Sequence, residues 1–185
     1  MPGIGAILLA AGESSRMGQL KALLPWRNTT LLEHQLRSLL DAGVQQVVVV
    51  VGHDADRLKP LIEAVEGASW ALNKDYLQGK TTSLKTGVAA LSGQPISDVL
   101  LLNVDQPRSA ATVRMLLERH QASPFRITIP THGGKGEGLI GKLAQQHAMV
   151  PGSFAYIPPQ SQWTVRNEGG DAVRFHWIRK AYQYD

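Results

Sequence analysis

Five consecutive valines, Val47 to Val51, constrain the fold of this chain more than any other feature. β-Branched side chains favour extended backbone, and Gly52 ends the run long before it could span a membrane. An uninterrupted apolar strand is typical of a parallel sheet that is covered by helices on both faces. A second run of this kind extends from Ile4 to Ala10. The two runs predict an α/β fold.

Helical and extended patterns alternate along the first 130 residues. Helices are expected over residues 29–42, 56–65, 82–91 and 110–121, and further strands over residues 69–73, 99–104 and 126–130. Thr29 and Thr30 are the candidate N-caps of the first helix, and Gly43 follows its end. This alternation predicts a mainly parallel sheet. Residues 133–138 have the composition of a loop, and the periodicity is weaker after them.

The composition limits both the architecture and the partners. A length of 185 residues suits one domain over residues 1–185, and the absence of cysteine excludes disulfides, thiolate metal sites and a cysteine nucleophile. The formal net charge of +4 is spread along the chain, which favours phosphate-bearing small molecules over nucleic acid as ligands. We find no signal peptide and no apolar run of membrane-spanning length, so we expect a cytoplasmic protein without membrane partners.

A small-residue loop follows the first predicted strand. Ligands of doubly wound sheets bind beyond the carboxyl ends of the strands, and the small residues here allow close approach of the backbone. Arg16 and Lys21 add cations suited to phosphate groups. The alternative is a tight surface turn with two solvated cations. The loop has neither the P-loop nor the dinucleotide glycine pattern, which disfavours both of those classes. The candidate binding residues are Leu9, Ala10, Ala11, Gly12, Glu13, Arg16 and Lys21.

A second candidate site follows the strand over residues 99–104. Asp105 comes at the mouth of this apolar strand, shortly before Pro107. A carboxylate in that position needs a cation, and Mg²⁺ is usually held by one or two carboxylates together with substrate phosphates. The alternative role for Asp105 is to cap the helix that begins near Ala110.

A third candidate lies between Asn73 and Gly87. Thr81, Thr82 and Ser83 stand where a helix is expected to begin, so N-capping is their simplest role. Contact with a base, ribose or phosphate is the alternative. His53 and His132 are isolated, and no second histidine at a ligand spacing supports either of them as a metal ligand.

Together these three segments resemble the MobA-like nucleotidyltransferases. The family includes molybdenum-cofactor cytidylyltransferase and molybdopterin-guanine dinucleotide synthase, and it is related to sugar-phosphate nucleotidyltransferases. The resemblance covers roughly residues 4–132 and rests on Leu9–Gly18 with Lys21, on Asn73–Gly87 and on Asn103–Pro107. It implies a three-layer Rossmann-like sheet of the glycosyltransferase-A-like nucleotidyltransferase fold. It also implies a nucleotide-binding part over residues 1–132 and a divergent acceptor-side part over 133–185.

The resemblance also implies a reaction. A phosphate oxygen of an acceptor such as molybdopterin attacks the α-phosphorus of CTP or GTP and expels pyrophosphate, with Mg²⁺ as cofactor. The backbone of Ala10–Gly12 and Glu13 would contact base and ribose, Arg16 and Lys21 the phosphates, and Asp105 the metal. Leu9, Asn73, Thr82 and Ser83 complete the implied nucleotide site. Contact with a molybdoenzyme would be transient.

The chain departs from the family pattern in its last third. Gly136–Gly138 stands where related cytidylyltransferases have Gly-His-Pro, and cations in Arg174–Tyr182 stand where they have carboxylates. Asp171 is the nearest carboxylate that would substitute as a metal ligand. The departures favour one alternative, an inactive nucleotide-binding accessory protein. A sugar-phosphate-type nucleotidyltransferase is a second alternative, which the acceptor that consumes triphosphate would distinguish.

Overall fold

A six-stranded sheet forms the centre of the computed structural model, which describes residues 3–13, 18–124, 127–132, 135–136 and 139–142. Its order is β5-β4-β1-β6-β10-β7. β1, β4, β5 and β6 pair in parallel, whereas β10 pairs antiparallel to both β6 and β7. The predicted mainly parallel sheet is therefore confirmed. The strands are β1 (Gly3–Ala10), β4 (Gln46–Val51), β5 (Ala68–Leu72), β6 (Ile96–Asn103), β7 (Ile127–Thr128) and β10 (Leu139–Lys142).

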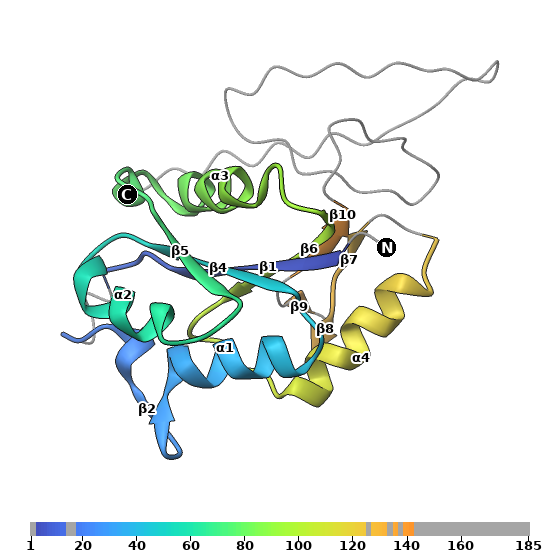
Figure 1. Ribbon diagram of the computed structural model, residues 1–185, viewed down its shortest axis with the longest axis horizontal. Helices are drawn as coiled ribbons and strands as arrows, with labels where there is room; N and C mark the ends of the chain where they lie inside the picture. Colours follow the sequence, from blue (N-terminus) through green and yellow to red (C-terminus); the bar gives the residue numbers. More distant parts are fainter. Residues whose placement is uncertain (1–2, 14–17, 125–126, 133–134, 137–138, 143–185) are drawn as a thin grey trace. The chain divides into compact units, whose positions relative to one another are not determined.

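Helices cover both faces of this sheet (Figure 1). One face carries α1 (Leu31–Asp41), α2 (Ala55–Glu63) and α4 (Ala110–Gln121), and the other carries α3 (Lys80–Leu91). Two apolar cores result, one on each side of the sheet. The predicted α/β fold with three layers is thus present in the described part of the chain.

The valine run divides between the two cores. Val47, Val49 and Val51 belong to the core beneath α1 and α2, while Val48 and Val50 belong to the core beneath α3. Successive side chains of a strand point to opposite faces, so only an uninterrupted apolar run can supply both cores. All five valines are almost completely buried.

The first helix begins with a capping box. The Thr30 hydroxyl accepts from the Glu33 backbone N–H at 3.2 Å, and the Glu33 carboxylate accepts from the Thr30 backbone N–H at 3.1 Å. Hydrogen bonds from the hydroxyls of Thr29 and Thr30 lower the pKa of Glu33 below its ordinary value. Of the two candidate N-caps, Thr30 is therefore the cap. Gly43 adopts φ +99° after the helix, as expected for a C-terminal glycine.

Two capping hypotheses are wrong. Helix α3 begins at Lys80, two residues before the expected start, and its N-cap is Gly79, which adopts φ +107°. The hydroxyls of Thr81, Thr82 and Ser83 therefore lie inside the first turns and do not cap the helix. Helix α4 is capped by Ser109, whose hydroxyl accepts from the Thr112 backbone N–H at 3.2 Å. Asp105 is consequently not a helix cap.

Several short elements had no clear sequence signal. The chain forms 3₁₀ turns η2 (Lys21–Leu23) and η3 (Tyr76–Gln78) and a small hairpin of β2 (Pro25–Trp26) with β3 (Thr29–Thr30). A second hairpin pairs β8 (Thr131–His132) with β9 (Lys135–Gly136). The expectation of a loop over 133–138 is therefore wrong at Lys135–Gly136, and β10 was not predicted.

The remaining expectations are not tested by the described residues. The division into residues 1–132 and 133–185 stays a prediction, and so does the assignment of residues 1–185 to a single domain. Arg174–Tyr182 and Asp171 lie outside the described residues as well. Among the helices that the structure describes, none has the length and apolarity needed to cross a membrane.

Candidate functional site

A pocket of about 710 Å³ opens at the carboxyl ends of β1 and β6. Four segments build its walls: the end of β1 with the loop after it, the turn η2, the connection from η3 into α3, and the end of β6. This is the position at which open α/β sheets bind ligands. Among the predicted site residues, those that line it are Leu9, Ala10, Ala11, Gly12, Glu13, Lys21, Ser83 and Asp105.

The loop after β1 is fixed to its neighbours by backbone contacts. His53 donates its backbone N–H to the Ala11 carbonyl at 3.3 Å, and Val104 donates to the Leu9 carbonyl at 3.0 Å. A Cβ on Gly52 would lie 2.7 Å from the Ala11 carbonyl oxygen and 2.8 Å from the Tyr76 ring. Glycine at position 52 therefore lets the strand end, this loop and Tyr76 approach one another.

Gly12 is in a different situation. It does not adopt a positive φ, and a Cβ placed on it would have no neighbour within 4 Å. The backbone conformation of Gly12 is therefore one that other residues can also adopt. Among the described residues, the fold therefore has room for a side chain at position 12.

Lys21 and Asp105 meet at the pocket. The Lys21 Nζ lies 2.7 Å from the Asp105 Oδ2, although the two residues are 84 positions apart in the chain. Their side chains are 38% and 41% exposed, so water screens the pair and its net contribution to stability is about 0–1 kcal/mol. The carboxylate does meet a cation, as its position suggested. A pair this accessible can separate when an anion reaches the lysine or a cation reaches the carboxylate.

Gln35 fixes the backbone in front of Asp105. This side chain of α1 is only 1% exposed, and its Nε2 donates to the carbonyls of Asn103 at 2.9 Å and Val104 at 3.0 Å. Sequence reasoning missed this residue, because a glutamine within an amphipathic helix is ordinarily solvated. A signal was nevertheless present, since Gln35 falls between Leu32 and Leu36 on the apolar side of the helix.

We expect Gln35→Met to lower the free energy of unfolding by about 1–3 kcal/mol, because the Val104 carbonyl loses the Gln35 donor while the side-chain volume changes little. The Asn103 carbonyl keeps its second donor, the Gln106 backbone N–H at 3.1 Å. Urea denaturation measures the change as a lower midpoint. Gln121→Met, at the exposed end of α4, is the matched control and should leave the midpoint unchanged. Equal midpoints for both variants would contradict the role of Gln35.

Only part of the third predicted segment, Asn73–Gly87, lines the pocket. Asn73 is 3% exposed, and its Nδ2 donates to the hydroxyls of Thr82 and Ser83, at 2.9 Å in each case. Of these three residues in the described structure, only Ser83 lines the pocket. Asn73 and Thr82 lie behind it, so the structure does not bring them into the pocket with the other predicted site residues.

A preformed metal centre is not present among the described residues, which contain no group of three His, Asp or Glu side chains able to hold an ion. Asp105 and Glu13 are the acidic residues of the described pocket lining. Mg²⁺ needs only one or two protein carboxylates when substrate phosphates supply further oxygens, so this donor set fits that mode of binding.

Two further residues from the sequence analysis are not part of the described pocket lining. The Nε2 of His53 lies 3.7 Å from the Oδ1 of Asp54, and its ring lies near the ring of Tyr76. Arg16 lies outside the described residues.

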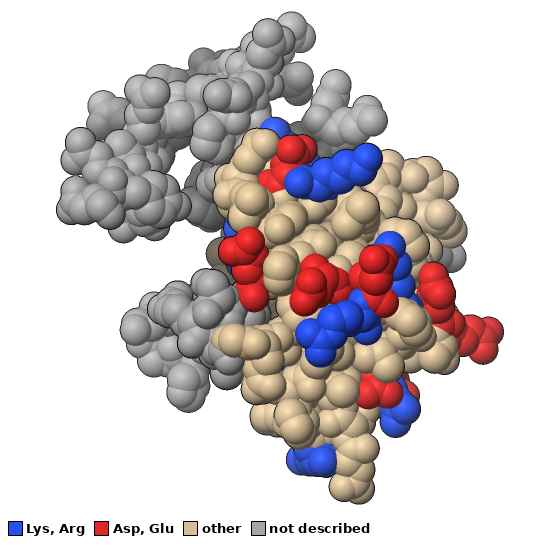
Figure 2. Space-filling model, turned by 90° about the vertical axis from the view of Figure 1, so that its left-hand side faces the viewer, with Lys and Arg blue, Asp and Glu red and all other residues tan. Residues whose placement is uncertain are grey.

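Charges of both signs alternate on the face shown in Figure 2. Acidic and basic side chains lie next to one another there, and neither sign forms a continuous patch among the described residues of that face. Nucleic-acid sites usually concentrate basic residues on one surface. A continuous basic surface of that kind is not seen among the described residues of this face.

Comparison with known proteins agrees with this geometry. Residues 6–161 match the family model of the MobA-like NTP transferase domain. Nicotine blue oxidoreductase of Paenarthrobacter nicotinovorans is 32% identical over 175 residues, which cover 94% of this chain and 81% of that protein. Molybdenum cofactor cytidylyltransferase of Escherichia coli strain K12 is 35% identical over 91 residues, covering 49% of this chain and 47% of that protein. Bifunctional protein GlmU of Clavibacter sepedonicus is 29% identical over 133 residues, 70% of this chain but only 27% of that longer protein.

Solved structures have the same fold. Rv0371c from Mycobacterium tuberculosis H37Rv superposes with a TM-score of 0.66 at 26% identity, over 76% of this chain and 72% of that chain. A nucleotidyl transferase from Methanothermobacter (Mth528) superposes with a TM-score of 0.64 at 26% identity, over 77% and 72% of the two chains. These neighbours confirm the three-layer Rossmann-like sheet that the sequence led us to expect.

Proposed function

The chain belongs to the MobA-like NTP transferase family, and we propose that it transfers CMP or GMP from a nucleoside triphosphate to a phosphorylated acceptor. One observation carries the proposal: a single pocket collects the small-residue loop after β1, the cation of Lys21 and the carboxylate of Asp105. Backbone N–H groups and a lysine suit phosphates, and a hard carboxylate oxygen suits a divalent cation.

The proposed reaction needs no covalent protein intermediate. A phosphate oxygen of the acceptor forms a bond to the α-phosphorus, the bond from that phosphorus to the β-phosphate oxygen breaks, and pyrophosphate leaves. Lys21 holds phosphate oxygens, and Asp105 becomes available to a cation once Lys21 has moved to the triphosphate. Mg²⁺, when bound, would neutralise the charge that develops on the phosphates. The chain's own contribution is to align the two reactants.

Molybdopterin is the acceptor we propose first. The supporting observation is the 35% identity over 91 residues to the E. coli protein, which is named for cytidylyl transfer to the molybdenum cofactor. A sugar phosphate is the second candidate, since the family as a whole does not fix the acceptor. A transient contact with a molybdoenzyme and a cytoplasmic location belong to the first proposal. The relative with 94% coverage is named an oxidoreductase, so the assay must test the transfer reaction directly.

Thermal unfolding in the presence of CTP, GTP, ATP or UTP, each with and without Mg²⁺, tests the proposal. A ligand at a hundred times its Kd stabilises the native state by about 2.7 kcal/mol, which raises the midpoint. A Mg²⁺-dependent rise with CTP or GTP, followed by pyrophosphate release on adding molybdopterin, is the expected result. Release with a sugar phosphate alone would identify the second acceptor. Binding without release would indicate an accessory protein, and no rise with any triphosphate would refute the proposal.

Position 12 gives a further prediction. We expect Gly12→Ala to leave the unfolding midpoint unchanged or slightly higher, because the site has room for a Cβ and alanine restricts the unfolded chain. The same substitution should weaken triphosphate binding, because the methyl group intrudes where the ligand approaches the backbone. Titration with the bound triphosphate measures the second effect.

Gly52→Ala is the matched substitution with the opposite expectation for stability. Its Cβ would lie within 3 Å of the Ala11 carbonyl and of Tyr76, so the midpoint should fall. If Gly12→Ala lowered the midpoint as much as Gly52→Ala, this result would contradict the space for a Cβ at position 12. If Gly12→Ala bound triphosphate like the wild type, the ligand would not approach this part of the loop.

A further inference from the structure

The pocket has two chemically different walls. Glu13, Lys21 and Asp105 give one wall its charges. Tyr76, Leu77 and Ser83 line the wall between η3 and α3. Among the described residues of this second wall only Lys80 is charged. The Leu77 side chain is 73% exposed, so a flat apolar ligand group would cover it. On the proposed function, the triphosphate belongs at the first wall and the base at the second.

Asn73 lies directly behind the second wall, and its orientation is determined by its partners. The backbone N–H of Asp75 can only donate, and it lies 3.0 Å from the Asn73 Oδ1. The other amide atom must therefore be the nitrogen, which donates to the Thr82 and Ser83 hydroxyls at 2.9 Å each. The amide thus links the end of β5 to the first turn of α3 with a fixed direction of donation.

The two hydroxyls use their own protons differently. Thr82 donates to the carbonyls of Gly79 at 2.8 Å and Asp75 at 3.0 Å. Ser83 accepts from Asn73 but donates to no partner within the described part of the chain. It is only 5% exposed, and it lines the pocket. A buried hydroxyl that already accepts one hydrogen bond has its proton left for a ligand.

We propose that Asn73 is a positioning residue that presents the Ser83 hydroxyl as a hydrogen-bond donor to an acceptor atom on the edge of the nucleobase. This inference rests on the proposed function and changes the predicted role of Asn73, which acts through Ser83 without touching the nucleotide. Ring nitrogens and carbonyl oxygens of bases are such acceptors. The hydroxyl then contributes to discrimination among triphosphates, because only a base with an acceptor at that point is bound well.

The variant Asn73→Asp reverses the direction of the hydrogen bond without changing the shape of the side chain. The new carboxylate still accepts from the Asp75 N–H, but it cannot donate, so the Ser83 hydroxyl turns its proton toward it. Only lone pairs of Ser83 then face the pocket. We expect the Kd of the preferred triphosphate to rise by about 10-fold and the preference among the four triphosphates to narrow.

A double-mutant cycle separates this role from a general effect on folding. Ser83→Ala alone should raise the Kd by about 2- to 10-fold, the usual effect of one lost hydrogen bond. Once Ser83 is alanine, adding Asn73→Asp should cost little more, so the two effects are not additive. Thr86→Val removes a hydroxyl one turn further along α3, outside the described pocket lining, and should leave the Kd unchanged.

Each outcome decides the matter. Additive effects of the two substitutions, or unchanged affinity in Asn73→Asp, would overturn the positioning role while leaving the proposed function in place. If Asn73→Asp did not fold, Ser83→Ala alone would still decide, since an unchanged preference among the four triphosphates contradicts a donor to the base. A wild-type chain that binds none of the four triphosphates would instead overturn the proposed function, and this inference with it.

Discussion

Replacing Asp105 with asparagine is expected to lower the rate of metal-dependent nucleotidyl transfer by about 10²- to 10³-fold, the usual effect of removing one group that stabilises transition-state charge. Asparagine has nearly the same shape but no charge, so it attracts a divalent cation much less and forms no ion pair with Lys21. The Asp105 side chain is 41% exposed, so the fold should be unaffected. Single-turnover rates measured over a range of Mg²⁺ concentrations report the effect.

The control is Asp56→Asn on α2. Asp56 lies 2.7 Å from the Nζ of Lys59, the same separation as in the Lys21–Asp105 pair, but it does not line the described pocket. Asp56→Asn should leave the rate unchanged, and both variants should unfold at the wild-type midpoint within a few degrees. Full activity in Asp105→Asn would refute the metal role of Asp105. Its remaining role would then be the surface ion pair with Lys21.

The common pocket of Lys21 and Asp105 illustrates what the sequence could predict, although the ion pair between them was not predicted. Both residues follow apolar runs that are buried on both faces, and such runs identify buried strands of a parallel sheet, although not which of these strands are neighbours. Parallel strands bring their carboxyl ends to one edge of the sheet, here with β1 and β6 adjacent. Residues 84 positions apart therefore meet at one pocket. The predicted helices and strands of the first 124 residues differ from the structure mainly at their ends.

Gln35 and Asn73 illustrate what the sequence could not predict. Each is a polar side chain almost completely buried, and its partners come from another element. Periodicity reports which face of an element is apolar, but it does not report which polar side chain finds buried partners. The antiparallel strand β10 was missed for a related reason. It has only four residues, and its place between β6 and β7 depends on pairing with residues far away in the chain.

Lys21→Ala is expected to raise the Kd of the bound triphosphate by about 10- to 100-fold, the range for a lost hydrogen bond to a charged group. Two effects act in the same direction. The ammonium group no longer contacts phosphate oxygens, and the carboxylate of Asp105, now without its partner at 2.7 Å, repels them. Calorimetric titration at constant ionic strength measures the change. Arg16→Ala should weaken binding by the same mechanism.

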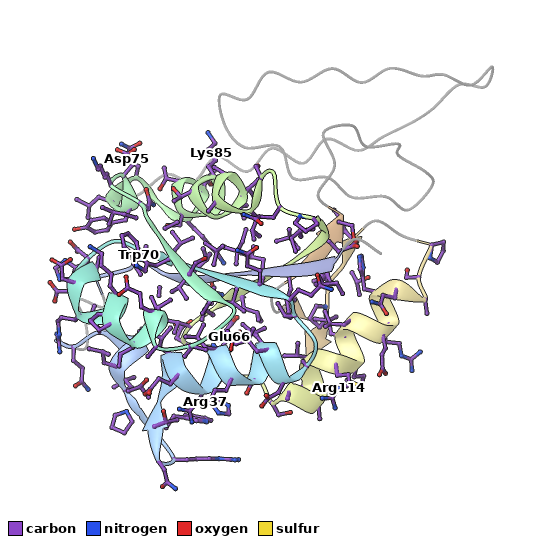
Figure 3. The ribbon with its side chains drawn as sticks, in the orientation of Figure 1. Arg37, Glu66, Trp70, Asp75, Lys85 and Arg114 are labelled. Carbon is purple, nitrogen blue, oxygen red and sulfur yellow. The ribbon has the colours of Figure 1, made fainter. Side chains whose placement is uncertain are left out.

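Two other lysines show whether the loss is specific to the pocket. Lys85 projects from α3 away from the sheet (Figure 3), so Lys85→Ala removes an equal charge without reaching the pocket. Lys59→Ala breaks an aspartate pair of the same length on α2. Both controls should bind triphosphate like the wild type. If all three lysine variants lost affinity equally, the effect would come from net charge. If Lys21→Ala and Arg16→Ala both bound normally, the loop after β1 would not be the triphosphate site.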